Sequence, residues 1–216
     1  MRYRSTPQES EQAVIERIAK DVLQEKYISI RLCEGFCIKE SIKKNKTEIS
    51  CKIEFKSVEK KSTINIKGHG DGPVDALFAN LKKKLSKEYC SLETLTFDEF
   101  GVNADIQQKP SYVLNQSGSN ASVEAVLVVG NDRGRELIFR NRSRSINKAA
   151  VNVVLQAIEY LINSEKAVLL LHSYIADARD RSRGDLLYTY TNQLSELVKN
   201  TSYEKIIERI KKEQQL

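Results

Sequence analysis

The sequence has few of the residues that most catalytic and metal sites need. Its 216 residues include two histidines, four cysteines and no tryptophan. The two histidines, His69 and His172, are far apart, and no cysteine pair has a partner that would complete a zinc site. No nucleophile–base–acid set is visible, although such sets assemble in space. We expect no metal, no cofactor and no catalytic residue, and we favour a non-enzyme over an enzyme.

Long hydrophobic runs are also missing. The longest nearly continuous run, Ala167 to Leu171, is far shorter than the ~20 residues that cross a bilayer. The segment from Met1 to Pro7 has no apolar stretch typical of a secretory signal. An eight-fold α/β barrel is excluded because it needs about 250 residues. We therefore expect a cytoplasmic protein with reduced thiols and no membrane partner.

The composition is that of an ordinary folded domain with a basic surplus. Hydrophobic residues make up 40% and charged residues 30%, and 35 Lys and Arg against 29 Asp and Glu give a net charge of +6. This length suits one domain with a substantial core, or one domain with appendages. The charge permits a nucleic-acid partner without favouring one.

Hydrophobic periodicity predicts a helix followed by three strands and a second helix. Helical spacing of apolar residues covers 8–26, and period-two alternation follows in 27–32, 48–55 and 64–66. A glycine-rich stretch then leads into a helix with one apolar face, which begins at Pro73 with Gly72 as its cap.

The same order of elements then recurs. Strand patterns over 92–104, 121–129 and 137–139 precede a helix over 146–162. The matched elements lie at nearly one offset: 72 positions from Ile49 to Ala121, and 73 from Ile64 to Leu137 and from Pro73 to Ile146. We predict an α+β fold of two β-β-β-α units, each an antiparallel sheet with its helix on one face.

The rest of the chain has a helical pattern. Residues 165–183, 186–199 and 203–213 form separate segments with apolar stripes that would pack on the sheet or on a second subunit. We divide the chain into an N-terminal helix (1–27), the repeated domain (28–163) and a helical C-terminal extension (164–216).

The glycine-rich loop holds Gly68, Gly70 and Gly72 between a strand and a helix. Such a loop can present backbone N–H groups to an anion at a helix N-terminus. It is neither a P-loop nor a dinucleotide fingerprint, because no Gly-Lys-Ser/Thr follows and Pro73 interrupts the spacing. The alternative is a tight turn that needs positive φ.

Several motifs carry a family resemblance. Gly68-x-Gly70-Asp71-Gly72-Pro73-Val74-Asp75-Ala76-Leu77 resembles the signature of the regulatory, dimer-forming C-terminal domain of 2-isopropylmalate synthase and citramalate synthase. The similarity continues over residues 28–163. It includes the strand motifs Glu99-Phe100-x-Val102 and Asn120-Ala121-x-Val123, and the helix from Ile146 to Leu161.

The resemblance implies a homodimer that binds leucine or isoleucine and restrains a catalytic barrel. The N–H groups of Gly70, Gly72 and the helix starting at Pro73 would receive the ligand carboxylate. Asp71 and Glu99 are candidates for the ammonium group. The apolar wall would be Val74, Phe100, Ala104, Ala121 and Val123. For Val74, Ala121 and Val123, a place in the core is the alternative.

Three departures from the family pattern affect this expectation. The family often has Gly-x-Gly before its second helix, where this chain has residues 140–145, and the family tyrosine is replaced by Phe100. The catalytic barrel and its metal-binding histidine pair are absent from the sequence. We expect a non-catalytic sensor that docks on a separate synthase subunit through helix 8–26 or the tail after 163. A fragment of a full synthase is a further alternative.

A basic segment supports another function class. Arg140, Arg142 and Arg144 would share one face of a strand. This face would bind nucleic acid or an acidic protein in a scaffold that has lost ligand sensing. The alternative is the solvated face of an edge strand. Phe139 is the one aromatic in the segment, which weakens an RNA-binding interpretation.

Overall fold

The computed structural model describes residues 7–105, 122–131, 134–199 and 203–214. These residues form two three-stranded antiparallel sheets, each followed by a helix. The first unit is β1 (Ser29–Ser41), β2 (Lys46–Lys56), β3 (Lys61–Gly70) and α2 (Pro73–Leu85). The second is β4 (Thr96–Asp105), β5 (Ser122–Gly130), β6 (Glu136–Ser143) and α3 (Ile146–Asp180). The predicted α+β fold of two β-β-β-α units is confirmed.

The remaining helices flank this core. Helix α1 (Pro7–Leu23) continues into the short 3-10 turn η1 (Gln24–Lys26), so the predicted helix 8–26 ends three residues early. A second 3-10 turn, η2 (Cys90–Leu92), lies where we expected the start of a strand, and that strand, β4, begins at Thr96. Helices α4 (Gly184–Val198) and α5 (Tyr203–Gln214) follow α3. No helix in the described part of the chain is both long and apolar enough to span a bilayer.

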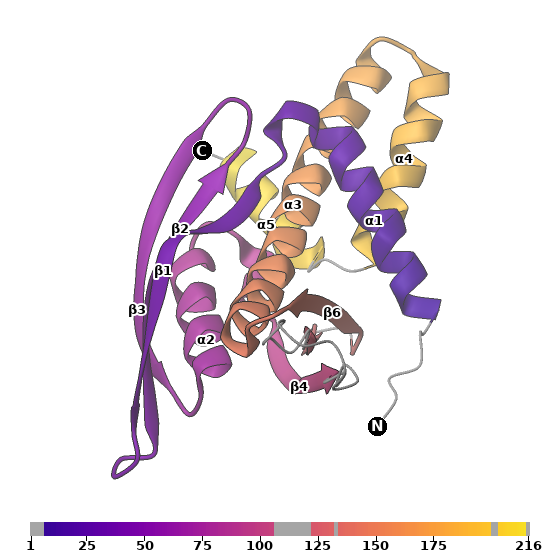
Figure 1. The fold of residues 1–216 in the computed structure, drawn as a ribbon. Coiled ribbons are helices and arrows are strands. Elements are labelled where there is room, and N and C mark those ends of the chain that lie inside the picture. The colour runs from indigo at the N-terminus through magenta and orange to yellow at the C-terminus, as the bar shows by residue number, and fades with distance from the viewer. Residues whose placement is uncertain (1–6, 106–121, 132–133, 200–202, 215–216) are drawn as a thin grey trace.

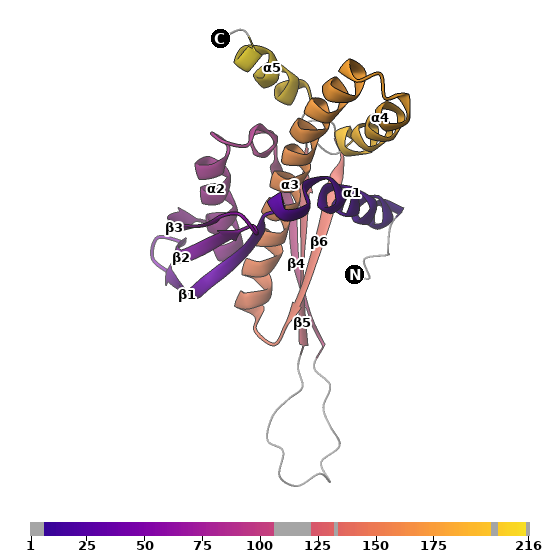
Figure 2. The same ribbon diagram turned by 90° about the horizontal axis from the view of Figure 1, so that it is seen from above.

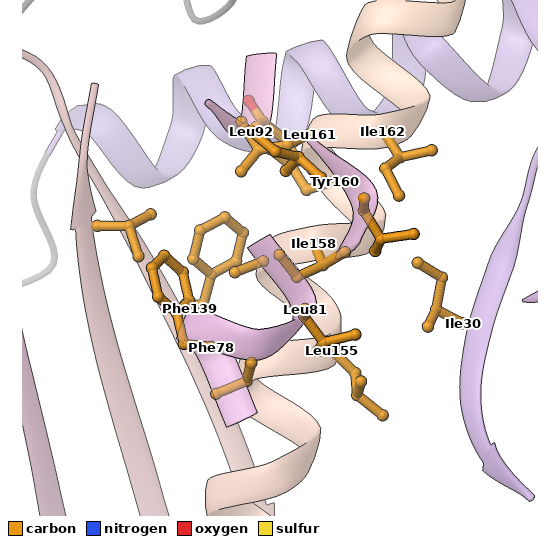
Figure 3. Close-up of a cluster of buried hydrophobic side chains, with 14 of the residues drawn as sticks. Ile30, Phe78, Leu81, Leu92, Phe139, Leu155, Ile158, Tyr160, Leu161 and Ile162 are labelled. Atoms are coloured by element: carbon orange, nitrogen blue, oxygen red, sulfur yellow. The ribbon is translucent and has the colours of Figure 1, made fainter. Parts of the chain in front are cut away.

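Helix α3 lies between the two sheets (Figures 1 and 2). It contacts β1 on one side and β5 and β6 on the other, while α2 packs on β2 and β3. The close-up in Figure 3 shows the resulting core, in which Phe78 and Leu81 from α2 meet Ile158 from α3 and Phe139 from β6. This burial of apolar surface is the main favourable contribution to folding.

The strand patterns are explained by their places in the sheets. Strand β2 is central, and its buried residues alternate from Thr47 to Phe55 as predicted. Strand β5 differs, because Val126 and Val128 on its second face are as buried as the core-facing residues between them. Both faces of this strand are therefore covered, a burial that the expected alternation did not include.

Helix α3 is one continuous helix of 35 residues, so the predicted separation into two helices near Asn163 is wrong. The polar run from Asn163 to Glu165 is buried, with every residue hydrogen-bonded. Ser164 Oγ donates to the Tyr160 carbonyl at 2.7 Å, while Asn163 and Glu165 bind backbone groups of other elements. Because these groups are satisfied inside the fold, they do not end the helix.

Candidate functional site

The two β-β-β-α units bring the N-terminal ends of α2 and α3 together. Helix α2 begins at Pro73 with Gly72 as its N-cap, as predicted, and α3 begins after Ser145, whose Oγ accepts the Lys148 N–H at 3.3 Å. Between these ends lies a cavity of about 10 Å³, lined by Val74 and Leu77 of α2 and Val151 of α3 among others. A space of this size holds a single water molecule at most.

The glycines before α2 are explained by close packing and not by a turn. Among described glycines, positive φ occurs at Gly134 and at none of the loop positions. A Cβ at Gly68 would lie 1.9 Å from Asn80 Nδ2, and a Cβ at Gly70 would lie 2.6 Å from the backbone nitrogen of Ala76. The alternative interpretation of this loop, a turn with positive φ, is therefore wrong. Gly68 and Gly70 let β3 approach α2, whereas a Cβ at Gly72 would meet nothing within 4 Å.

Acidic groups already occupy the start of α2. The Asp71 N–H donates to Asp75 Oδ2 at 3.1 Å, so the carboxylate of the first turn is bound to the loop residue that precedes the N-cap Gly72. Asp71 itself is exposed. The Asp75 charge complements the helix dipole, so a ligand carboxylate at this end would be placed beside an existing negative charge.

The apolar candidates divide between core and surface. Val74 and Val123 are buried, and Phe100 packs against the core cluster. Ala104 pairs with Val123 across β4 and β5 but is exposed, as is the nearby Val102 at 37%. These residues of sheet β4–β6 share one face, whose end toward Ala104 is open in the protomer. Ala121 lies outside the described residues.

Glu99 does not join this group. It pairs with Val128, whereas its neighbour Phe100 pairs with Leu127, so the two side chains project from opposite faces of the sheet. Of the two acids expected to bind an ammonium group, only Asp71 therefore lies near the glycine loop. The structure thus places the glycine loop and Val74 at one helix end and separates Glu99 from them.

Arg140 and Arg142 lie on β6, which is an edge strand, whereas Arg144 follows the end of this strand, so the expected strand face holds two of the three arginines. Arg140 and Arg142 face away from the core, opposite Val126 and Glu124 in the register. Arg142 Nε forms an ion pair with Glu124 Oε1 at 2.9 Å, and Arg144 is exposed. The edge-strand placement is confirmed. The pairing of Arg142 with Glu124 reduces the positive charge that this face would offer to phosphates.

Sequence reasoning missed the polar side chains of α3 that hold the other elements in place. Asn163 Oδ1 accepts the Ile28 N–H at 2.9 Å and its Nδ2 donates to the Ile28 carbonyl at 2.8 Å, as a neighbouring strand would. Glu165 accepts the N–H groups of Cys90 and Ser91 at 3.1 and 2.7 Å. The available signal was three polar residues within a long apolar helical pattern.

Glu159 belongs to the same set. Its Oε2 accepts the Ile30 N–H at 2.7 Å and its Oε1 accepts the Tyr27 hydroxyl at 3.3 Å. Burial raises the pKa of Glu159 above its ordinary value, and burial together with the nearby Glu159 charge raises the pKa of Tyr27.

A comparison with protein families places the chain in a known family. The model described as the LeuA allosteric (dimerisation) domain matches residues 9–162. Among curated proteins, none matches the sequence. The matched region begins inside α1 and ends inside α3. It therefore includes both β-β-β-α units and the helix that precedes them.

Proposed function

Because the chain belongs to the LeuA allosteric (dimerisation) domain family, the regulatory domain of isopropylmalate and citramalate synthases, we propose that it is a homodimeric, non-catalytic sensor of a branched-chain amino acid. Its ligand would be leucine or isoleucine, and its target a separate synthase catalytic subunit. The family match is the observation that carries this proposal.

The ligand site is proposed at the N-terminal ends of α2 and α3, beside the open face of the second sheet. In one protomer the cavity there is about 10 Å³, too small for an amino acid. Yet Val102 and Ala104 leave an apolar edge of the second sheet exposed. We propose that a second protomer covers this edge and that the ligand binds in the space between the two.

Polar groups near this edge would bind the two charged groups of an amino acid. The backbone of the glycine loop would receive the carboxylate, and the exposed Asp71 would receive the ammonium group. The first turn of α2 already carries Asp75, so the carboxylate is expected to bind away from that side chain. Val74 and Phe100, at the border of the core, would contact the branched side chain.

Docking on a synthase subunit is assigned to the C-terminal helices. Of the two expected adaptor segments, α1 already uses Ile15 and Ala19 to pack in the core. Helix α4 has one buried residue, Leu197, and exposes Tyr188 to 72%. We propose the exposed side of α4 as the surface that meets the catalytic subunit.

The first test combines thermal unfolding with light scattering. A ligand at about 100 times its Kd adds about 2.7 kcal/mol to the free energy of unfolding, which shifts Tm measurably. We expect a dimer whose Tm rises with leucine or isoleucine and not with their D-enantiomers. A monomer that no branched-chain amino acid stabilises would contradict the proposal.

A matched pair of variants locates the site. Ala104 and Asn103 are adjacent, exposed and on opposite faces of β4. Ala104→Glu is expected to remove the ligand-induced rise in Tm and to weaken the dimer, whereas Asn103→Glu is expected to keep the rise in Tm and the dimer.

Mixing the chain with a synthase barrel that lacks its own regulatory domain tests the partner. Feedback inhibition by the amino acid should then appear in that mixture.

A further inference from the structure

Two neighbouring cavities meet at Glu159 of α3. One, of about 330 Å³, lies between α1, β6 and α3 and is lined by Gln12, Glu16, Tyr27, Arg140, Glu159 and Tyr160 among others. The other, of about 730 Å³, lies between β1, β6 and α3. Both volumes are within the range of small-molecule sites. Gln156 and Glu159 line both cavities.

We propose that the chain binds the primary ammonium group of a small ligand at Glu159, in a site separate from the amino-acid site proposed above. The Glu159 carboxylate is held in place by the Ile30 N–H and the Tyr27 hydroxyl, at 2.7 and 3.3 Å. A carboxylate has about four acceptor positions, so these two bonds leave capacity for a ligand N–H.

The Glu159 charge is poorly compensated. Among the residues that the structure describes, no cationic side chain forms an ion pair with it. Glu16 lines the same cavity, and its negative charge adds to the effect of burial on the pKa of Glu159. Lys20 is bound to Glu16 at 2.6 Å on the exposed side of α1. A cation entering the cavity would be attracted by these two carboxylates, against the opposing charges of Lys20 and of Arg140, which lines the same cavity.

The lining favours an organic ammonium ion over a metal ion. The described residues contain no group of three His, Cys, Asp or Glu side chains that could hold a metal. An ammonium group has three N–H donors, which suits two carboxylates and a glutamine amide oxygen. The larger cavity continues from Glu159 past Ile30, Leu32, Phe36 and Leu155, and its lining also includes the charged residues Arg31, Glu34 and Lys148. It would hold an aliphatic body attached to the ammonium group.

Because Arg140 also lines the smaller cavity, two types of ligand fit the proposed site. One is a simple alkylamine, and the other is an amine that also carries a carboxylate. Calorimetry with pentylamine and with 5-aminopentanoate distinguishes them. Pentanoate, which lacks the ammonium group, is the control ligand and is expected not to bind. If Arg140 receives a carboxylate, 5-aminopentanoate binds more tightly than pentylamine, and Arg140→Gln removes that difference. Otherwise the simple amine is the ligand class.

Three carboxylate variants test the anchor. Glu159→Gln should weaken pentylamine binding about 10- to 100-fold, which is the range for losing a hydrogen bond to a charged group. Glu16→Gln, which leaves the Ile30 contact intact, should weaken binding less and keeps the test valid if Glu159→Gln fails to fold. Glu93→Gln changes a carboxylate paired with Lys205, outside both cavities, and should bind as the wild type does.

Lack of pentylamine binding to the folded wild-type chain would overturn the proposal. Equal affinity in the wild type, Glu16→Gln and Glu159→Gln would also overturn it. The site is independent of the proposed sensor site. Ala104→Glu should therefore leave pentylamine binding unchanged even where it abolishes the response to leucine or isoleucine.

Discussion

Gly70 and Gly72 lie two residues apart in the loop before α2, and the structure predicts a large effect of alanine at the first position and a small one at the second. At Gly70, a Cβ would lie 2.5 Å from Asp75 Oδ2, 2.6 Å from Ala76 N and 2.7 Å from Ala76 Cα. Two of these atoms belong to the backbone of the first turn of α2, which cannot move without shifting the helix. At Gly72, a Cβ would meet no atom within 4 Å.

The magnitudes follow from these distances. Overpacking typically costs 1–3 kcal/mol, and Gly70→Ala is expected at about 3 kcal/mol because the contacts are with backbone. The φ of Gly72 is −156°, an extended conformation that alanine also adopts. Alanine there gains about 0.4–1 kcal/mol by restricting the unfolded chain and loses a similar amount as a poorer N-cap. Gly72→Ala should therefore change stability by less than about 1 kcal/mol.

Urea denaturation followed by circular dichroism measures both variants against the wild type. Each is measured at several protein concentrations, because the stability of a dimer depends on concentration. If Gly70→Ala is as stable as Gly72→Ala, the close approach of β3 to α2 is not the reason for the first glycine. Since Gly72→Ala preserves the fold, any loss of ligand response in it would report on the proposed site itself.

Three further predictions concern buried groups. Asn163→Ala should cost about 2–4 kcal/mol in urea denaturation, because it leaves the Ile28 N–H and carbonyl without their partner; a loss below 1 kcal/mol would contradict this. Burial raises the pKa of Cys51 to about 11, so a thiol reagent at neutral pH should modify exposed Cys37 quickly and Cys51 only on unfolding, as peptide mass mapping would show. The raised pKa of Glu159 favours its protonated form in the folded state, so its contribution to stability is full at low pH and is lost as pH rises through that pKa. Compared with Glu159→Gln in urea denaturation, the wild type should therefore become relatively more stable as pH falls from neutral toward the ordinary carboxyl range, and a constant difference would refute this.

The architecture was predictable because one buried face leaves a periodic pattern. Strand β2 alternates because its residues face either the helices or the other side of the sheet. The spacing that relates Pro73 to Ile146 reflects two helices that begin at equivalent points of the two units. The resemblance to the family rested on local motifs of the same kind, and the family match over 9–162 confirms it.

The environment of individual groups was not predictable from local patterns. Glycine in a loop suggested positive φ, but Gly70 is required by a helix packed against it, which only tertiary contacts reveal. Glu99 and Phe100 are adjacent in one motif and were both expected at the ligand site, but their side chains project from opposite faces of β4. Such errors arise because the sequence pattern gives faces and spacing, whereas a site depends on which elements meet.

Helix α3 shows that the folded unit extends beyond the region that the family model matches. The family match ends at residue 162, but the helix continues without a break to Asp180. Val168 and Leu171, beyond the matched region, are fully buried and belong to the same hydrophobic cluster as Ile15 of α1 and Leu197 of α4. Burying a side chain of this kind contributes about 1.5–3 kcal/mol, which is large against the 5–15 kcal/mol that stabilises a typical domain. The end of the family match is thus not a folding boundary. A ligand or partner that moves α3 at its N-terminal end would act on the same rigid helix that carries α4.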